Sequence, residues 1–530
     1  MNAGSLGSPT SSVESGPEAT TDLNANALAV LQPGFIGTCP PDWLLRRLGE
    51  GLGSVALFAR NVEDPEQLAA LTEALRKERP EVLVAIDEEG GDVTRLEARK
   101  GSSFPGNLAL GAVDDPRLTR SVARALGQAL AACGVNLNWA PSADVNSDPR
   151  NPVIGVRSFG AEPQLVARHT AAYVEGLQDV GVAACTKHFP GHGDTSVDSH
   201  HALPTIHADA ELLAARELLP FRAALAAGSK AVMSAHILVP ALDSSLPATL
   251  SGAVLTGLLR APESQGGLGY EGLIVTDGIE MNAIAATYGI ERGTVLAIAA
   301  GADAICVGGG LADEETVLRL RDALVRAVRA GELPEERLAD AAARVRSLAR
   351  WARSRALEAA NEGPGPVPAD LTVGLSAARR ALRVTPGRPE FDPVTAPPYV
   401  AALTPVANIA VGEETPWGLA AELDQLLPGT AVGTFRAPEA TGERLPEVVA
   451  EVLSRARDRR IVVAVRDVHR HPWMAAALAD LVAARPDAIV VEMGVPQAEP
   501  VGALHIATHG AARVCGRAAA EVIVGNGAEG

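Results

Sequence analysis

One stretch of the chain, residues 187–204, concentrates side chains that can take part in chemistry. It reads KHFPGHGDTSVDSHHALP and holds four histidines and two aspartates among few apolar residues. A buried segment could not supply hydrogen-bond partners for so many polar groups, so the composition predicts an exposed loop. A loop so rich in titratable groups is also predicted to be functional.

Three interpretations of this stretch compete: a solvated surface loop, a metal site and an acid–base pair. His192, Asp194, Asp198 and His200 are metal-ligand types, but no HExxH or CxxC spacing supports a metal site. Asp198 and His200 are two residues apart, so an extended backbone would place both side chains on one face. There the carboxylate would fix the imidazole tautomer and raise its pKa toward neutrality. We favour the acid–base interpretation.

Lys187, which begins the stretch, is unusual in this chain. Only four of the 46 basic residues are lysines, and arginine stands almost everywhere else. A lysine kept in such a background is a candidate for a role that the planar guanidinium group cannot fill.

The segments that must position these residues alternate between apolar runs and amphipathic helical patterns from residue 34 to about 310. Runs that are apolar on both faces and separated by helices indicate a parallel sheet. Eight such runs predict an N-terminal (β/α)₈ barrel, with a doubly wound open sheet as the alternative. No GxGxxG follows the first run, which disfavours dinucleotide binding. The predicted strands are 34–38, 54–59, 81–87, 135–141, 182–189, 231–237, 272–278 and 302–308.

Polar residues stand at the ends of several predicted strands. Asp87 ends the third, Lys187 and His188 end the fifth, His236 ends the sixth and Asp277 ends the seventh. A single Asp after a strand commonly caps the next helix. Four chemically useful strand ends instead indicate an active site at the carboxyl-terminal face of the barrel.

Length and composition restrict the possible partners. A chain of 530 residues is too long for one core, and its net charge is −18 with 3% aromatic residues. Such a chain is unsuited to nucleic acids and to anionic membranes, and it favours small soluble substrates over polyanions. Its five cysteines are odd in number and widely spaced, which is typical of reduced thiols in a cytoplasmic protein.

The domain boundaries follow from changes in composition. Residues 1–22 lack a basic and an apolar region and are predicted to be a disordered tail, not a signal peptide. The barrel is predicted over 23–360, and a Pro/Gly linker over 361–372. A C-terminal α/β three-layer sandwich is predicted over 373–530, with strands at 399–406, 460–468, 487–494 and 503–510.

Several blocks of the sequence resemble one known family. KHFPGHGDTSVDSH resembles the signature of the β-N-acetylglucosaminidase branch of glycoside hydrolase family 3. Blocks similar to those of the family occur in its order over residues 30–355: IDEEGGDVTRL, FPGNLALGA, NWAPSADVN, NPVIGVRSFG, LPFRAAL, VMSAHI and GLIVTDGIEMNAI. The chain departs from the family at Gly278, where a second aspartate is frequent, and at Asp92 and Val156, where relatives often carry a polar or basic residue. The departures at Asp92 and Val156 concern substrate subsites more than mechanism.

The resemblance implies a role for each matching residue. Asp277 matches the catalytic nucleophile, His200 the general acid/base and Asp198 its partner. The residues that match those holding the terminal sugar are Asp87, Arg95, Arg157, Lys187 and His188. A retaining glycosidase needs a carboxylate nucleophile and an acid that later acts as a base, and a histidine backed by a carboxylate can be that acid.

The function implied by this resemblance is a cytoplasmic, retaining exo-β-N-acetylglucosaminidase. It would act on small glycans or muropeptides and would need neither a metal nor an organic cofactor. Two alternatives remain open: a phosphorylase, because a histidine base tolerates phosphate as the acceptor, and a non-catalytic sugar-binding regulator on the same scaffold.

Overall fold

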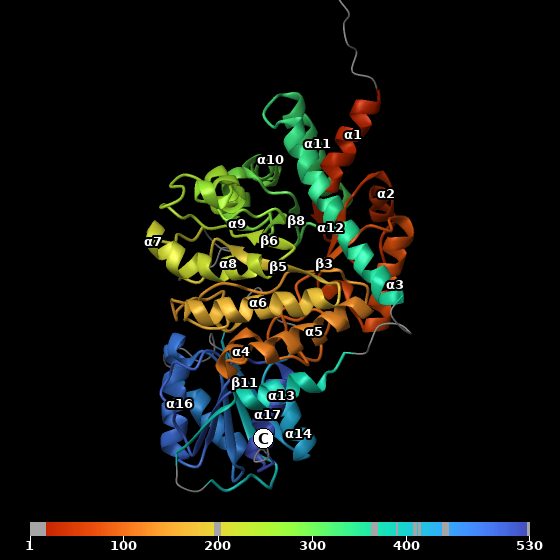
Figure 1. The fold of residues 1–530 in the computed structure, drawn as a ribbon. Helices are drawn as coiled ribbons and strands as arrows, with labels where there is room; N and C mark the ends of the chain where they lie inside the picture. Colours follow the sequence, from red (N-terminus) through yellow and green to blue (C-terminus); the bar gives the residue numbers. More distant parts are fainter. Residues whose placement is uncertain are drawn as a thin grey trace, which may run out of the picture.

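The computed structural model describes residues 17–195, 203–361, 369–387, 391–405, 411, 415–436 and 445–526. Its strands form two separate groups, one on each side of residue 361 (Figure 1). In the described residues, no helix is both long enough and apolar enough to span a membrane.

The N-terminal group is a ring of parallel strands. Six of them pair in chain order, from β2 to β7, and β1 pairs with β8. The backbone N–H of Thr276 donates to the carbonyl oxygen of Ala304 over 3.0 Å, which joins β7 to the β8 segment. The Ser54 hydroxyl donates to the carbonyl oxygen of Leu31, which links β2 to β1. The strands are β1 Leu31–Pro33, β2 Ser54–Leu57, β3 Leu83–Ile86, β4 Leu137–Asn138, β5 Ala183–Phe189, β6 Ala231–Ser234, β7 Leu273–Thr276 and β8 Ile305–Val307.

Helices surround this ring, and several begin where the sequence supplies a cap. Helices α3 Pro65–Glu78, α5 Pro116–Ala132 and α6 Pro163–Asp179 each start at a proline. The acidic side chain before each proline accepts a hydrogen bond from a backbone N–H of the first turn. The other helices here are α1 Pro17–Ala29, α2 Asp42–Glu50, α4 Asn107–Val113, α7 Ala210–Leu212, α8 Leu218–Ala226, α9 Asn282–Tyr288, α10 Ile290–Ala300, α11 Glu314–Arg329 and α12 Glu335–Asn361.

The strands are buried on both faces, as their apolar runs predict. Along β3, Val84 and Ile86 pack outward against the helices, whereas Leu83 and Ala85 belong to the interior cluster. Trp139 lies in the same interior cluster, together with side chains from α12. The N-terminal part of the chain is therefore a TIM-like α/β fold.

The second group is a six-stranded sheet in the order β11-β10-β12-β13-β14-β9, parallel except for β9. One buried cluster packs it against α15 and α16, and another packs it against α14 and α17, which gives three layers (Figure 1). The elements are α13 Thr372–Ala381, β9 Arg383–Pro386, β10 Tyr399–Thr404, α14 Ala420–Leu426, β11 Ala431–Arg436, α15 Leu445–Ala456, β12 Ile461–Val465, α16 Pro472–Ala484, β13 Ile489–Glu492, β14 Leu504–Ala507 and α17 Arg513–Ile523.

Two expectations from the sequence are wrong near the N-terminus. The first strand is Leu31–Pro33, not 34–38, because its buried residues pair with β8 and the chain turns away after Pro33. Helix α1 begins at Pro17, inside the predicted tail, because its apolar residues Leu23 and Leu28 are buried in the barrel core. Residues 362–368 of the predicted linker lie outside the described residues.

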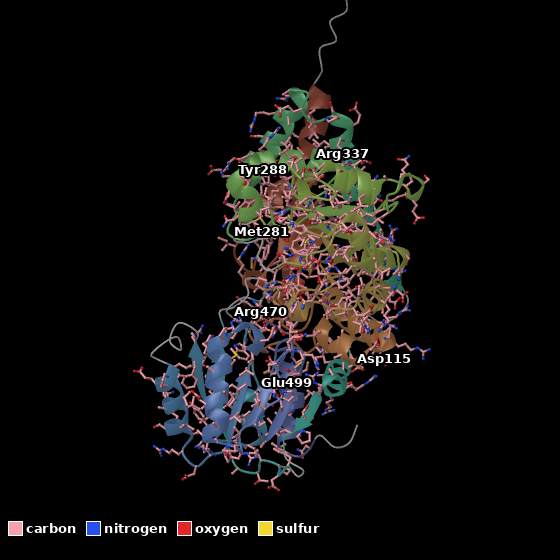
Figure 2. All side chains as sticks on the ribbon, turned by 90° about the vertical axis from the view of Figure 1, so that its left-hand side faces the viewer. Asp115, Met281, Tyr288, Arg337, Arg470 and Glu499 are labelled. Carbon is pink, nitrogen blue, oxygen red and sulfur yellow. The ribbon has the colours of Figure 1, made fainter. Side chains whose placement is uncertain are left out.

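Asp92 joins the two parts of the chain. Its carboxylate pairs with the Arg466 guanidinium and also accepts a hydrogen bond from the backbone N–H of Ala511 over 2.7 Å. Arg380 donates to Asp115 over 3.0 Å across the same junction, where Figure 2 labels Asp115 and Arg470. The departure from the family at Asp92 therefore concerns contact with the second sheet.

Candidate active site

The polar residues at the strand ends gather at one end of the barrel. Asp87 follows β3, Lys187 lies in β5 and Asp277 follows β7. The buried thiol of Cys185 lies close to all three residues. Burial is the main reason that its pKa is raised, and the charges of Lys187, Asp87 and Asp277 also change that pKa. Three strands thus bring one cation and two carboxylates together at their carboxyl ends.

Lys187 is the centre of a buried ion network. Its Nζ lies 2.5 Å from Oδ1 of Asp87 and 2.7 Å from Oε1 of Glu89, and only 1% of the residue is exposed. Burial alone would lower the pKa of Lys187, but the two carboxylates raise it above its usual range. A compact ammonium can lie between two carboxylates of the one segment that follows β3, which gives a physical reason for a lysine at this position.

Arg157 completes the network from a different loop. Its guanidinium donates twice to Glu89, with Nη2–Oε1 at 2.7 Å and Nε–Oε2 at 3.0 Å. Arg95 lies farther out, with its Nη2 3.9 Å from Oδ2 of Asp87. Glu89 therefore has two cations to balance its charge, and they hold its pKa below the usual range despite its burial.

His188 forms a second buried pair, with Asp144. The ring Nδ1 lies 2.7 Å from Oδ2 of Asp144, and Nε2 lies 3.4 Å from the guanidinium of Arg157. The other oxygen of Asp144 accepts hydrogen bonds from the backbone N–H groups of His188 and His192. Burial would raise the pKa of Asp144, but the charge of His188 lowers it below its usual range. Asp144 thus orients the His188 ring and anchors the chain after β5.

Sequence reasoning missed Glu89 and Asp144 as members of this site. Both lie in the blocks IDEEGG and NWAPSADVN that resemble the family. The available signal was an acidic residue within a few positions after a predicted buried strand, since a charge there must be paired when it is buried.

The end of β5 and the residues that follow it up to Gly193 are buried, which contradicts the prediction of an exposed loop for this part of residues 187–204. Residues 187–193 are all buried, and neighbouring loops supply hydrogen-bond partners to several of them. Asn151 Nδ2 donates to the carbonyl oxygens of His192 and Gly193, each over 3.0 Å. A Cβ on Gly193 would lie 1.7 Å from the carbonyl oxygen of Val145, so only glycine fits at this close approach.

Asp198 and His200 lie outside the described residues. Among the described residues before them, Asp194 is held by Arg216, whose Nη2 lies 2.5 Å from the Oδ2 of Asp194. Arg216 also donates to Oε1 of Glu217 over 2.6 Å. Across the described parts of the chain, no group of three His, Cys, Asp or Glu side chains is arranged to hold a metal ion.

Asp277 is half-buried, and the backbone around it is held on both sides. Its N–H donates to the carbonyl oxygen of Ser234, and its Oδ1 accepts from the N–H of Gly278 over 2.8 Å. His236 uses both ring nitrogens, one with Thr249 and the other with the carbonyl oxygen of Gly278, each at 2.9 Å. His236 therefore supports the segment that carries Asp277.

Replacing Glu89 with glutamine should destabilise the protein by about 3–5 kcal/mol, because two buried cations lose their shared countercharge. The free energy of unfolding, measured by urea denaturation, tests this. The matched control is Glu175→Gln, since Glu175 forms an exposed pair with Arg120 and its loss should cost under about 1 kcal/mol. Equal effects of the two changes would contradict the network.

Glu217→Gln should remove part of the pH dependence of stability. Burial raises the pKa of Glu217 to about 7, so between pH 5 and 7 the folded protein keeps a proton that the unfolded chain releases. The stability of the wild type should therefore fall as pH rises through this range. The variant should match it near pH 5 and exceed it by about 3 kcal/mol at pH 8. A stability difference that does not change with pH would contradict this.

The family profile that matches this chain covers most of the barrel and stops before the second sheet. Residues 48–348 match the profile of the glycosyl hydrolase family 3 N-terminal domain. The chain is 35% identical over 335 residues to beta-hexosaminidase A of Pseudoalteromonas piscicida, which covers 59% of this chain and 55% of that protein. It is 38% identical over 262 residues to a beta-hexosaminidase of Alkalilimnicola ehrlichii, covering 48% of this chain and 73% of the relative.

A solved structure resembles nearly the whole chain. A glycoside hydrolase family 3 beta-N-acetylglucosaminidase from Paenibacillus sp. str. FPU-7 superposes with a TM-score of 0.82 and 36% identity, covering 95% of this chain and 97% of that one. A beta-glucoside phosphorylase shares the fold at 19% identity, with a TM-score of 0.71, covering 96% of this chain and 94% of that one. By its matched profile and its relatives, the chain belongs to glycosyl hydrolase family 3.

Proposed function

We propose that this protein is a retaining exo-β-N-acetylhexosaminidase. It would release terminal β-linked N-acetylglucosamine from small glycans or muropeptides in the cytoplasm. The observation that carries the proposal is the convergence of Asp277 with the Asp87–Lys187–Glu89–Arg157 network at one end of the barrel. The names of the relatives support the sugar class.

The network is suited to hold a sugar by its hydroxyl groups. Asp87 is about one-quarter exposed, so its carboxylate can accept hydrogen bonds from a bound ligand. Lys187 and Arg95 would donate to other hydroxyls, while Glu89 and Asp144 would keep Lys187, Arg157 and His188 in place. The buried acids therefore act as positioning residues.

The proposed chemistry proceeds in two displacements at the anomeric carbon. First, a carboxylate oxygen of Asp277 bonds to that carbon as the bond to the leaving oxygen breaks, and His200 protonates the leaving oxygen. Then His200 removes a proton from water, whose oxygen attacks the same carbon and releases Asp277. Asp198 would orient the His200 ring throughout. No step calls for a metal or an organic cofactor.

We also propose that the chain has two domains, predicted at residues 23–360 and 373–530 and joined by a linker at 361–372, with the start of the first moved to Pro17 to include α1. The two separate sheets, each with its own buried clusters, support this division. The five free cysteines, four of them buried, support a cytoplasmic location.

Turnover of an aryl β-N-acetylglucosaminide, followed by NMR of the first product, tests the proposal. We expect the β-anomer of N-acetylglucosamine to appear first, and we expect added phosphate to leave the product unchanged. An α-anomer would contradict retention, and a glycosyl phosphate would favour a phosphorylase. An absence of turnover on aryl and natural substrates would favour a sugar-binding regulator.

A further inference from the structure

A cavity of about 670 Å³ lies between the barrel and the second sheet. Loop residues 151–157 line it from the barrel, and the carboxyl ends of β10, β11 and β12 line it from the sheet. Among the described residues, Arg157 borders it, but Asp87, Lys187 and Asp277 do not. The cavity therefore adjoins the site at the mouth of the barrel through Arg157, but Asp87, Lys187 and Asp277 do not line it.

The strand order marks this cavity as a ligand site. The chain passes from β10 to β11 on one side and then returns to place β12 on the other side of β10. The connections that leave these strands therefore diverge and open a crevice at their carboxyl ends. The place where the strand order reverses in this way is called a topological switch point, and open parallel sheets bind ligands there. Thr404, Thr434 and Ala464, from β10, β11 and β12, line the cavity there.

The charges around the cavity favour an anion. Four arginines and two aspartates line it, in a chain whose net charge is −18. Arg466 pairs with Asp92, and Arg470 lies 3.7 Å from Asp467, while Arg436 ends β11 with its side chain exposed. Burial, followed by the positive charge of Arg470, lowers the pKa of the nearby His471. Arg157 is paired with Glu89 in the barrel, so the exposed guanidinium of Arg436 is the lining group most open to a small anion.

The uncharged lining favours a sugar. The half-buried indole of Trp417, one of only five tryptophans in the chain, lines the cavity and offers a flat apolar surface. Thr404 and Thr415 also line it, and among the described residues their buried Oγ1 atoms have no hydrogen-bond partner. These Oγ1 atoms are buried, so the two residues border the cavity with their other atoms, and Trp417 is the side chain that favours a sugar.

We propose that this cavity binds a small phosphorylated sugar. The arginines at the ends of β11 and β12 hold the phosphate, since a dianion can accept hydrogen bonds from several guanidinium groups. Trp417 packs against the apolar face of the sugar ring, and Thr404 and Thr415 border the ring without binding it through their hydroxyls. This site is separate from the one at which the proposed hydrolysis takes place.

Isothermal titration calorimetry of the full chain with N-acetylglucosamine 6-phosphate tests the proposal. We expect binding that is at least tenfold weaker for N-acetylglucosamine and for inorganic phosphate, because each lacks half of the recognised groups. Trp417→Ala and Arg436→Ala should each weaken binding at least tenfold. Arg459→Ala is the matched control and should change the Kd less than twofold, since the exposed Arg459 lies at the opposite, amino-terminal edge of the sheet.

Asp87→Ala separates this site from the mouth of the barrel. If the cavity is the site, Asp87→Ala binds the sugar phosphate as the wild type does. Loss of binding in Asp87→Ala with retention in Trp417→Ala would overturn the proposal, as would an absence of binding to the wild type. Equal affinity for inorganic phosphate would overturn the assignment of a sugar. Arg436 is exposed, so Arg436→Ala should fold and can replace Trp417→Ala in the test if that variant does not fold. All of these measurements are of binding, so none of them requires turnover.

Discussion

Asp277→Ala should lower kcat on β-N-acetylglucosaminides by roughly three to five orders of magnitude, because the covalent route then has no nucleophile. The fold should remain intact, since Asp277 is half-buried at a strand end and the surrounding backbone is held by His236. Steady-state kinetics and a thermal melt of the variant, each compared with the wild type, measure the two effects.

Labelling identifies the nucleophile independently of the kinetics. A mechanism-based fluorosugar should modify Asp277, as read by mass spectrometry of the peptides. Two other aspartates are informative alternatives. Asp303 lies at the opposite end of β7, where it accepts from the N–H of Ile274 and pairs with Arg337, and Asp194 is paired with Arg216. Label on Asp194 or Asp303 instead would contradict the assignment.

His200→Ala should affect substrates according to their leaving group. A natural disaccharide has a poor leaving group that must receive a proton, so its kcat/KM should fall by roughly two to four orders of magnitude. An activated aryl glycoside needs little protonation, so its first step should be largely preserved and its deglycosylation should become limiting. Azide should then restore rate, because it attacks the glycosyl-enzyme without a general base.

Asp198→Ala is the milder companion, since it removes only the residue that orients the ring. It should show the same split between substrates with smaller losses. Equal losses on both substrate types in His200→Ala would count against the acid–base pair. So would loss of wild-type activity on treatment with EDTA, which would instead indicate a metal.

The sequence predicted the barrel well because burial on both faces leaves a clear signal. Seven of the eight predicted strands overlap the observed ones, and Asp87, Lys187 and Asp277 lie at strand ends as expected. The two strands whose residues are mostly not buried, β9 and β11, were not predicted. β9 has no buried residue and β11 has only two, so neither produces an apolar run.

The burial and the ion pairs of the site residues were harder to predict than the identity of those residues. The polarity of residues 187–193 indicated exposure, but their partners include Asn151 and Asp87, which lie 41 and 100 residues earlier in the chain than the residues they bind. Spacing along the chain carries no information on such pairs. The same reason explains why Glu89 and Asp144 were missed, since each is recognised only by the cations that the fold brings to it.

Asp92 has a consequence for how the protein denatures. It lies five residues after Asp87, and its buried carboxylate depends on Arg466 and the Ala511 N–H from the second sheet. Removing the second sheet would leave this charge uncompensated beside the loop that shapes the sugar site. The two halves should therefore melt together, as one heat-absorption peak in a calorimeter. A catalytic fragment cut at the linker should lose sugar affinity as well as thermal resistance.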